Sequence, residues 1–290
     1  MPRGFFCCIL LIFLIIFYSC ELFDRKEYIP SYINIENIIV KTNLQTEGTT
    51  SHSITDAWIY VDNELIGVFE IPFNVPVLKS GDKKIVIAPG IKNNSSDSHR
   101  VIYPVMNDYY IDTLLIEEEI TTINPEFRYK TGAVRFFEDF DGVGNIFEIS
   151  EISDTIIKYI SGEEAFEGRS MAFYLDDNRK NFECRSTELY ELPDDRPVYL
   201  EINHKSTDPF VFGIFAKEYS GSGIIEKRIP VFTFNPSPYE WKKTYIQLNY
   251  HLNASGPYSE YRLFFTCSRQ ENPYGQKTKV FIDNIKIVHL

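Results

Sequence analysis

The chain has 290 residues, 29 basic and 41 acidic side chains, and a formal net charge of −12 at pH 7. This acidity excludes nucleic acid as a partner, because its phosphates would be repelled rather than neutralised, and it argues against broad adsorption to anionic lipid. The length exceeds one average domain, so we expect two. A composition rich in Ile, Phe and Tyr and poor in Ala and Met favours strands, which predicts an all-β fold.

The N-terminus has the pattern of a secretory signal. Arg3 precedes thirteen uninterrupted apolar residues, 5–17, and the small residue Ser19 precedes Cys20. The apolar run is too short for a comfortable transmembrane helix, which needs about 20 residues. This order resembles the bacterial lipobox, and the resemblance implies that residues 1–19 are a lipoprotein signal peptide and that Cys20 becomes the lipidated N-terminus.

The next segment is interpreted as a tether. Residues 20–30 mix charges with a proline and show no periodicity. Acyl chains on Cys20 would hold a soluble domain at a membrane, because they bury many methylene groups. An uncleaved N-terminal anchor and an ordinary signal peptide are the alternatives.

Strand signals recur from residue 31 onward, and no stretch of this half has a helical period. Three runs have the alternation or the β-branched content of strands: residues 33–38, 56–61 and 84–88. Asp62-Asn63 is expected to close the second run as a turn, and Pro89-Gly90 to end the third. We therefore predict a first β-sandwich over residues 31–128.

One block of this half resembles a known family. Residues 58–67 give a strand, an Asp-Asn turn and a glycine, and residues 76–87 give a glycine-led hairpin into another strand. This order resembles the PEGA domain, a small β-module of bacterial envelope proteins. The resemblance implies an immunoglobulin-like sandwich used for spacing or binding, with no catalytic residues to carry over.

A second boundary falls at residues 124–133. Beyond it the chain opens on the strand-like residues 134–142 and closes on residues 279–287, and further runs lie between them at residues 168–175, 197–202 and 241–248. The opening Phe-Glu-Asp-Phe and the closing Phe-Ile-Asp-Asn-Ile-Lys-Ile resemble the jelly-roll sandwiches of carbohydrate-binding modules. The resemblance implies a jelly-roll sandwich over residues 131–290 whose first and last strands pair. Many modules of this shape bind no sugar, because one fold hosts many functions.

Two cysteines besides Cys20 follow the signal. Cys184 and Cys267 both lie in strand-like runs, and in an exported protein they would be able to form one disulfide. The alternative is two separate buried thiols that pack as small apolar residues. We favour the alternative, because the sequence does not show that the two strands are neighbours.

Catalytic patterns are missing from the sequence. The five histidines are scattered without zinc spacing, and neither a Gly-x-Ser-x-Gly elbow nor a phosphate-binding Gly-Lys-Ser/Thr loop occurs. We therefore predict that the protein is not an enzyme, although a glycosidase needs only two carboxylates.

The resemblance to jelly-roll modules also implies a metal site. In such modules, acidic residues at the ends of the first and last strands often hold a structural calcium ion, and Glu138, Asp139 and Asp283 stand at the matching positions. Calcium needs six to eight oxygen ligands, so carbonyl groups would have to complete the shell. The alternative is that Asp283 satisfies backbone groups while Glu138 and Asp139 face water.

Sugar binding calls for exposed aromatic faces beside amides and carboxylates. Tyr239 and Tyr274 each follow a proline in loop-like sequence, and they are our candidate ligand-binding residues. Most other aromatic residues are expected in the core. Trp241 begins a predicted strand and is expected to be one of these core residues.

The acidic, cysteine-anchored chain with two predicted sandwiches resembles envelope lipoproteins of the Bacteroidota. The resemblance implies a lipid-anchored protein of the cell envelope, at the outer membrane, facing either the periplasm or the cell surface. We expect a non-catalytic glycan-binding module on a spacer domain. The alternative is a structural subunit that binds protein within a cell-surface or secretion complex.

Overall fold

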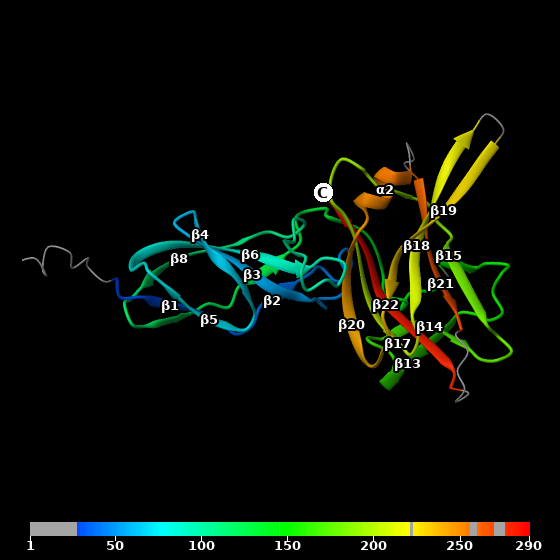
Figure 1. Cartoon of the computed structure of the whole chain (residues 1–290), viewed down its shortest axis with the longest axis horizontal. Helices are drawn as coiled ribbons and strands as arrows, with labels where there is room; N and C mark the ends of the chain where they lie inside the picture. Colours follow the sequence, from blue (N-terminus) through cyan, green and yellow to red (C-terminus); the bar gives the residue numbers. More distant parts are fainter. Residues whose placement is uncertain (1–27, 145, 221–222, 256–259, 270–275) are drawn as a thin grey trace, which may run out of the picture.

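The structure is a computed structural model, and it describes residues 28–290 except 145, 221–222, 256–259 and 270–275. The described chain is almost entirely β-structure, as the composition predicts, and forms an elongated molecule of two parts (Figure 1). We call residues 28–130 the N-terminal region and residues 131–290 the C-terminal sandwich. The predicted signal peptide, Cys20, most of the tether and Tyr274 lie outside the described residues.

No helix in the described part of the chain has the length and apolarity needed to cross a membrane.

The N-terminal region consists of three sheets around one core. The largest has the order β4-β3-β6, with β7 and β8 also on β6; its strands are β3 (Ile54–Val61), β4 (Glu64–Glu70), β6 (Gly81–Lys92), β7 (Arg100–Ile102) and β8 (Tyr109–Leu115). The second has the order β5-β1-β9, from β1 (Ser31–Ile35), β5 (Phe73–Val77) and β9 (Ile120–Thr122), and the third pairs β2 (Ile39–Lys41) with β10 (Glu126–Arg128). Alternating apolar residues of these strands fill the core, among them Ile33, Ile59, Ile87 and Phe127.

Two local predictions for this region have different outcomes. The turn between β3 and β4 is confirmed: Asp62 and Asn63 both have positive φ, 52° and 66°, as a two-residue hairpin turn of this hand requires. The predicted strand end at Pro89-Gly90 is wrong, because β6 continues to Lys92. Pro89 falls between the stretches of β6 that pair with β8 and with β7. Gly90 lies against the Trp58 ring, which a Cβ at Gly90 would approach to 2.3 Å.

The C-terminal sandwich consists of two six-stranded sheets. The inner sheet has the order β13-β14-β22-β17-β20 with β11 also on β22; its strands are β11 (Val134–Glu138), β13 (Lys158–Ser161), β14 (Arg169–Leu175), β17 (Val198–Ser206), β20 (Ser237–Gln247) and β22 (Thr278–His289). The outer sheet has the order β12-β15-β21-β18-β19 with β16 also on β21; its strands are β12 (Phe147–Ile149), β15 (Asn181–Ser186), β16 (Tyr190–Glu191), β18 (Phe210–Ser220), β19 (Gly223–Phe234) and β21 (Glu260–Ser268). A 3-10 turn, η2 (Gly162–Glu164), and a short helix, α2 (Asn249–Ser255), complete it.

The core of the sandwich lies between these sheets, where Phe173 of β14 stacks on Phe182 of β15 with ring centroids 3.8 Å apart. The first strand, β11, pairs antiparallel with the last, β22, from Val134↔Val288 to Glu138↔Ile285. This confirms the predicted pairing of the two ends of the sandwich.

Cys184 and Cys267 lie on neighbouring strands but out of register. In the antiparallel pair β15–β21, Cys184 stands opposite Phe265 and Cys267 stands opposite Phe182. Both thiols are free and buried in the sandwich core. Burial raises the pKa of the Cys267 thiol to about 12, and it raises the pKa of Cys184 as well, so neither side chain has the thiolate character of a reactive cysteine.

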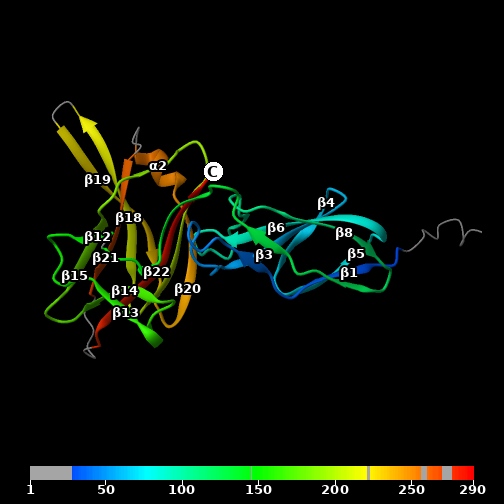
Figure 2. The same cartoon turned by 180° about the vertical axis from the view of Figure 1, so that it is seen from behind.

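One end of the N-terminal region packs against the outward face of the inner sheet (Figure 2). Along β17, Leu200 and Ile202 point into the sandwich core, whereas Tyr199 belongs to the core of the N-terminal region. Tyr245 of β20 and Val288 of β22 also belong to that second core. The two parts therefore share buried apolar surface, and the N-terminal region is packed on the sandwich rather than only tethered to it.

Candidate functional site

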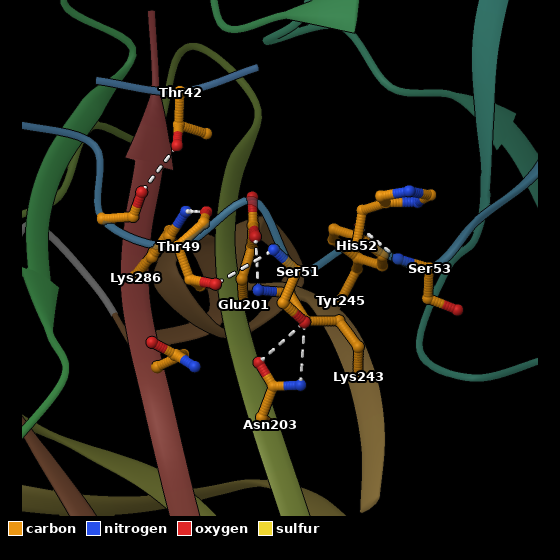
Figure 3. A network of polar contacts seen from close by, with 12 residues as sticks. Thr42, Thr49, Ser51, His52, Ser53, Glu201, Asn203, Lys243, Tyr245 and Lys286 are labelled. Atoms are coloured by element: carbon orange, nitrogen blue, oxygen red, sulfur yellow. Dashed lines mark hydrogen bonds and ion pairs between the residues drawn. The ribbon is translucent and has the colours of Figure 1, made fainter. Parts of the chain in front are cut away.

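A buried charge network joins the two parts of the molecule (Figure 3). Glu201 of β17 is fully buried, and its Oε1 accepts hydrogen bonds from the hydroxyls of Tyr103 at 2.7 Å and Tyr129 at 2.6 Å. Its Oε2 forms an ion pair with Lys243 Nζ of β20 at 2.9 Å. Burial raises the pKa of Glu201, but Lys243, Lys286 and the two tyrosine hydroxyls outweigh this effect and hold the pKa below its ordinary value. Glu201 is therefore an ionised carboxylate with two hydrogen-bond donors on Oε1 and a lysine ammonium beside Oε2.

Lys286 of β22 is the second buried cation of this network. Its Nζ donates a hydrogen bond to the backbone carbonyl of Thr49 at 2.8 Å and lies 5.0 Å from the centroid of the Tyr129 ring. Burial lowers the pKa of Lys286 to about 8, while the nearby Glu201 acts in the opposite direction. The ammonium thus fixes the segment around residue 49 against the inner sheet.

Polar contacts continue from this network toward solvent (Figure 3). The backbone N–H of Ser53 donates to the Tyr245 hydroxyl at 2.9 Å, and the Asn203 amide donates to Ser51 Oγ at 3.1 Å. On the other side of β20, the backbone N–H of Asn94 donates to the carbonyl of Tyr245 at 2.9 Å. These bonds hold two loops of the N-terminal region, around residues 51–53 and 93–95, along one edge of the sandwich.

A cleft of about 410 Å³, which we call the junction cleft, opens where these loops meet strand β20. The N-terminal region contributes Ser51, His52, Ser53 and Ser95, and the sandwich contributes Phe166, Asn203 and residues 240–244. Trp241 and Phe166 form its aromatic wall, with ring centroids 5.5 Å apart and an edge-to-face geometry. The rest of the lining is polar, with hydroxyl, amide, imidazole, carboxylate and ammonium groups.

The electrostatics of the cleft are close to neutral. Lys243 is paired with Glu201, and the half-exposed Lys242 lies 3.6 Å from the carboxylate of Glu240. Burial, and then the charge of Lys243, lower the pKa of His52, so this imidazole is neutral at pH 7. Its Nδ1 accepts a hydrogen bond from the backbone N–H of Ile54 at 3.4 Å. The cleft is built to offer hydrogen bonds and an aromatic face rather than a strong net charge.

His204 lies directly behind the cleft. Its Nε2 is 3.0 Å from Thr244 Oγ1, which in turn is 3.1 Å from Ser95 Oγ, and its ring packs on Phe234. Burial, reinforced by Lys242, lowers the pKa of His204 to about 4. The folded protein therefore keeps this imidazole neutral at pH values where an unfolded chain would protonate it.

We expect the stability of the protein to fall in acid partly through His204. Its folded pKa lies below the unfolded value of 6.5, so its contribution is complete above pH 6.5 and is lost as pH falls toward 4. The loss is on the order of 3 kcal/mol at about 1.4 kcal/mol per pKa unit. The free energy of unfolding by urea, measured from pH 7 to pH 4.5, should vary less with pH in His204→Gln than in the parent. The exposed His99→Gln should keep the parental slope, and an equal slope in His204→Gln would contradict the assignment.

The three acidic residues predicted to bind calcium have protein partners in the structure. Asp283 is buried, and it accepts hydrogen bonds from Ser170 Oγ at 2.6 Å and from the backbone N–H of Asn284 at 2.7 Å. Glu138 Oε1 accepts a hydrogen bond from the backbone N–H of Phe140, and Asp139 Oδ1 accepts one from the backbone N–H of Asp141. Among the residues that the structure describes, no three His, Cys, Asp or Glu side chains form a group that could hold a metal ion. The structure thus does not bring the three together as a metal site, and calcium binding stays a prediction.

Asp283 provides the test of that prediction. Burial raises the pKa of Asp283 to about 7, although the hydrogen bonds from Ser170 and the backbone act in the opposite direction. A bound cation would favour the ionised form of this carboxyl group. The calcium hypothesis predicts a higher thermal midpoint in millimolar calcium than in EDTA, because an ion bound only by the native state stabilises it. Asp283→Asn should abolish this increment. Equal midpoints of the parent protein in the two conditions would remove the hypothesis.

The predicted sugar-binding residues are placed differently from expectation. Tyr239 of β20 is 93% exposed, as a ligand platform requires, but it does not line the cleft, and Tyr274 lies outside the described residues. Trp241 is not a core residue: it is half-buried and forms the cleft wall with Phe166. The sequence analysis missed Asn203, because a lone asparagine within a strand gives no functional signal.

Comparison with known proteins gives a fold-level result. No family model matches this sequence, and no curated protein matches it. Among solved structures, a Clostridium thermocellum xylanase fragment with CBM22-1 and GH10 modules, complexed with xylohexaose, matches at 14% identity and a TM-score of 0.39, over 55% of this chain but only 29% of that chain.

Two isolated modules are matched over most of their length. The family 11 carbohydrate-binding module of a Clostridium thermocellum cellulosomal cellulase matches at 19% identity and a TM-score of 0.35, over 53% of this chain and 92% of that one. The CBM22-1 xylan-binding domain of a Paenibacillus barcinonensis protein matches at 13% identity and a TM-score of 0.36, over 55% and 96%. At these identities the likeness concerns the fold alone. The chain is an all-β protein with a β-sandwich region similar to those of carbohydrate-binding modules.

Proposed function

We propose that the protein is a non-catalytic glycan-binding lipoprotein of the bacterial cell envelope. In this proposal, acyl chains on Cys20 attach it to the outer membrane, and a saccharide binds in the junction cleft. The observation that carries the proposal is that the aromatic pair of Trp241 and Phe166 lines the same cleft as Ser51, His52 and Asn203. These are the two kinds of surface that a sugar needs in one place.

The physical fit has three parts. The C–H faces of a pyranose ring pack on aromatic rings, and Trp241 is half-exposed rather than core-buried. Sugar hydroxyls exchange hydrogen bonds with amide, hydroxyl and ammonium groups, which Asn203, Ser51 and Lys242 present. The volume of about 410 Å³ is within the range of small-molecule sites, roughly 300–1,000 Å³.

The cleft is also preorganised. Its two walls come from different parts of the chain, and the buried network around Glu201 fixes these parts to each other. A rigid site loses less conformational entropy on binding than one that forms on contact. In this proposal the N-terminal region is part of the binding site, beyond the spacer role expected from the sequence.

The alternative, an accessory subunit that binds another protein, has weaker support. Strand β19 is an edge of the outer sheet, and an exposed edge is able to pair with a strand of another chain. However, β19 carries the exposed charges Glu226, Lys227 and Arg228 and also Pro230, which are the features that protect an edge from such pairing. The cleft therefore favours the glycan over a protein partner.

The test is a glycan array probed with the soluble chain of residues 21–290, with and without EDTA, followed by calorimetric titration of each positive glycan. We expect a neutral saccharide of a few units to bind, because the charged side chains of the cleft are paired. If the protein binds no glycan on the array, the proposed ligand class is wrong.

The lipid anchor is tested separately. Protein purified from membranes should carry acyl chains on an N-terminal Cys20 by mass spectrometry, and Cys20→Ala should lose them. An intact N-terminus beginning at Met1 would contradict lipidation and would leave the glycan proposal unaffected.

A further inference from the structure

One end of the N-terminal region, where the described chain begins, lies farthest from the sandwich (Figure 1). Several residues at this end have exposed apolar side chains. We call this end the tip surface and define it by Tyr28, Leu65, Leu78, Ile116 and Ile120. Tyr28 is 73% exposed, Leu78 64%, Ile120 57% and Leu65 50%. Single exposed apolar residues are ordinary, but several at one end of a domain indicate a contact surface.

The strand pairing brings these residues together. Ser31 pairs with Val77 and Tyr32 pairs with Ile120, so Leu78 and Ile120 flank the start of β1 on its two sides. The carbonyl of Pro30 accepts a hydrogen bond from the backbone of Glu118, which fixes the loop that contains Ile116 beside the entering chain. The tip surface is therefore a property of the folded sheets and does not depend on one mobile loop.

A groove of about 490 Å³ runs across this surface. Its lining comprises Tyr28, Glu64, Leu65, Ile66, Pro76, Val77, Leu78 and Lys79. The only charged members are Glu64 and Lys79, and they form an ion pair with each other at 2.7 Å. The groove thus combines the exposed apolar side chains of Tyr28, Leu65 and Leu78 with polar groups whose two charges are paired.

The position of this surface along the chain identifies its partner. Seven residues, 21–27, separate Cys20 from Tyr28, and an extended chain spans at most about 3.6 Å per residue. With the proposed lipid on Cys20, this length would hold the tip surface within roughly 30 Å of the bilayer. The nearby acidic run of Glu117, Glu118 and Glu119 would be repelled by anionic headgroups, which favours a zwitterionic bilayer.

We propose that the tip surface rests on the lipid bilayer, with Tyr28, Leu65 and Leu78 at the boundary between headgroups and acyl chains. This inference rests on the proposed lipidation of Cys20. The acyl chains supply the anchoring, and the apolar contact adds buried area at the membrane and fixes how the domain is oriented on it. The long axis of the molecule then stands away from the membrane, and the junction cleft is held at a distance from the lipid (Figure 1).

The test uses the full lipidated protein in phosphatidylcholine vesicles, with the environment-sensitive dye NBD attached to Leu78→Cys. Because Cys184 and Cys267 are buried, the dye reacts with the introduced thiol. The matched control is Ile156→Cys, a residue of similar exposure (60%) in the C-terminal sandwich. We expect a severalfold rise in NBD emission at position 78 on reconstitution, quenched by brominated acyl chains, and no change at position 156.

Each other outcome overturns the proposal in a recognisable way. In the first, the protein is acylated by mass while the dye at position 78 still emits as it does in water. That result overturns the tip contact and leaves the anchor intact. Emission at position 78 that rises without quenching by brominated lipid indicates a second protein copy as the occupant. An unmodified N-terminus overturns the anchor and this inference together. Leu65→Cys provides a second labelling position should Leu78→Cys fail to fold.

Discussion

Replacement of Glu201 by alanine is expected to lower the free energy of unfolding by about 3–5 kcal/mol, the cost of removing one partner from a buried ion pair. The reason is that Lys243 and Lys286 would stay buried without the carboxylate that stabilises their charge, and the hydroxyls of Tyr103 and Tyr129 would lose their acceptor. Chemical denaturation followed by near-UV circular dichroism measures this loss.

The matched control is Glu226→Ala. Glu226 forms ion pairs with Arg185 and Arg262 on the surface of the outer sheet, and surface pairs contribute at most about 1 kcal/mol. Glu201→Gln keeps an oxygen for the tyrosines but no charge, so it should recover only part of the loss. Equal stability of Glu201→Ala and Glu226→Ala would show that the buried network does not stabilise the junction.

Replacement of Trp241 by alanine is expected to weaken glycan binding by at least about tenfold, which corresponds to about 1.4 kcal/mol. Trp241 provides the larger ring of the cleft wall, and aromatic residues at the centre of a binding site carry a large share of the affinity. Calorimetric titration with a glycan that is positive on the array measures the change. The thermal midpoint should be recorded as well, because Trp241 also packs near Phe281.

Two variants make this experiment specific. Tyr250→Ala removes an aromatic side chain that is 78% exposed on α2 and does not line the cleft, and it should bind as the parent does. Tyr239→Ala tests the residue that the sequence analysis selected on the same strand. Loss of binding in Tyr239→Ala with full binding in Trp241→Ala would move the ligand site from the junction cleft to the exposed end of β20.

Several strands and two of the connections between them were predictable from residue patterns alone. Alternation of apolar and polar residues depends only on neighbours two positions apart, so the predicted runs around residues 33–38 and 56–61 contain strands. The Asp62-Asn63 turn is equally local, because it depends on the tolerance of these residues for positive φ. The closing pair β11–β22 was predicted from a resemblance between motifs at the two ends of the sandwich, and the register confirms it.

The position of the cleft depends on contacts between residues that are far apart in the sequence. Ser51 and Asn203 are 152 positions apart, and they meet because the N-terminal region packs on the outward face of the inner sheet. A strand pattern gives the side of a sheet on which a residue lies, but it does not say whether that side faces water or another part of the chain. Trp241 was expected in a core for this reason. Glu201 gave no signal, because its two tyrosine partners and its lysine partner come from three separate segments.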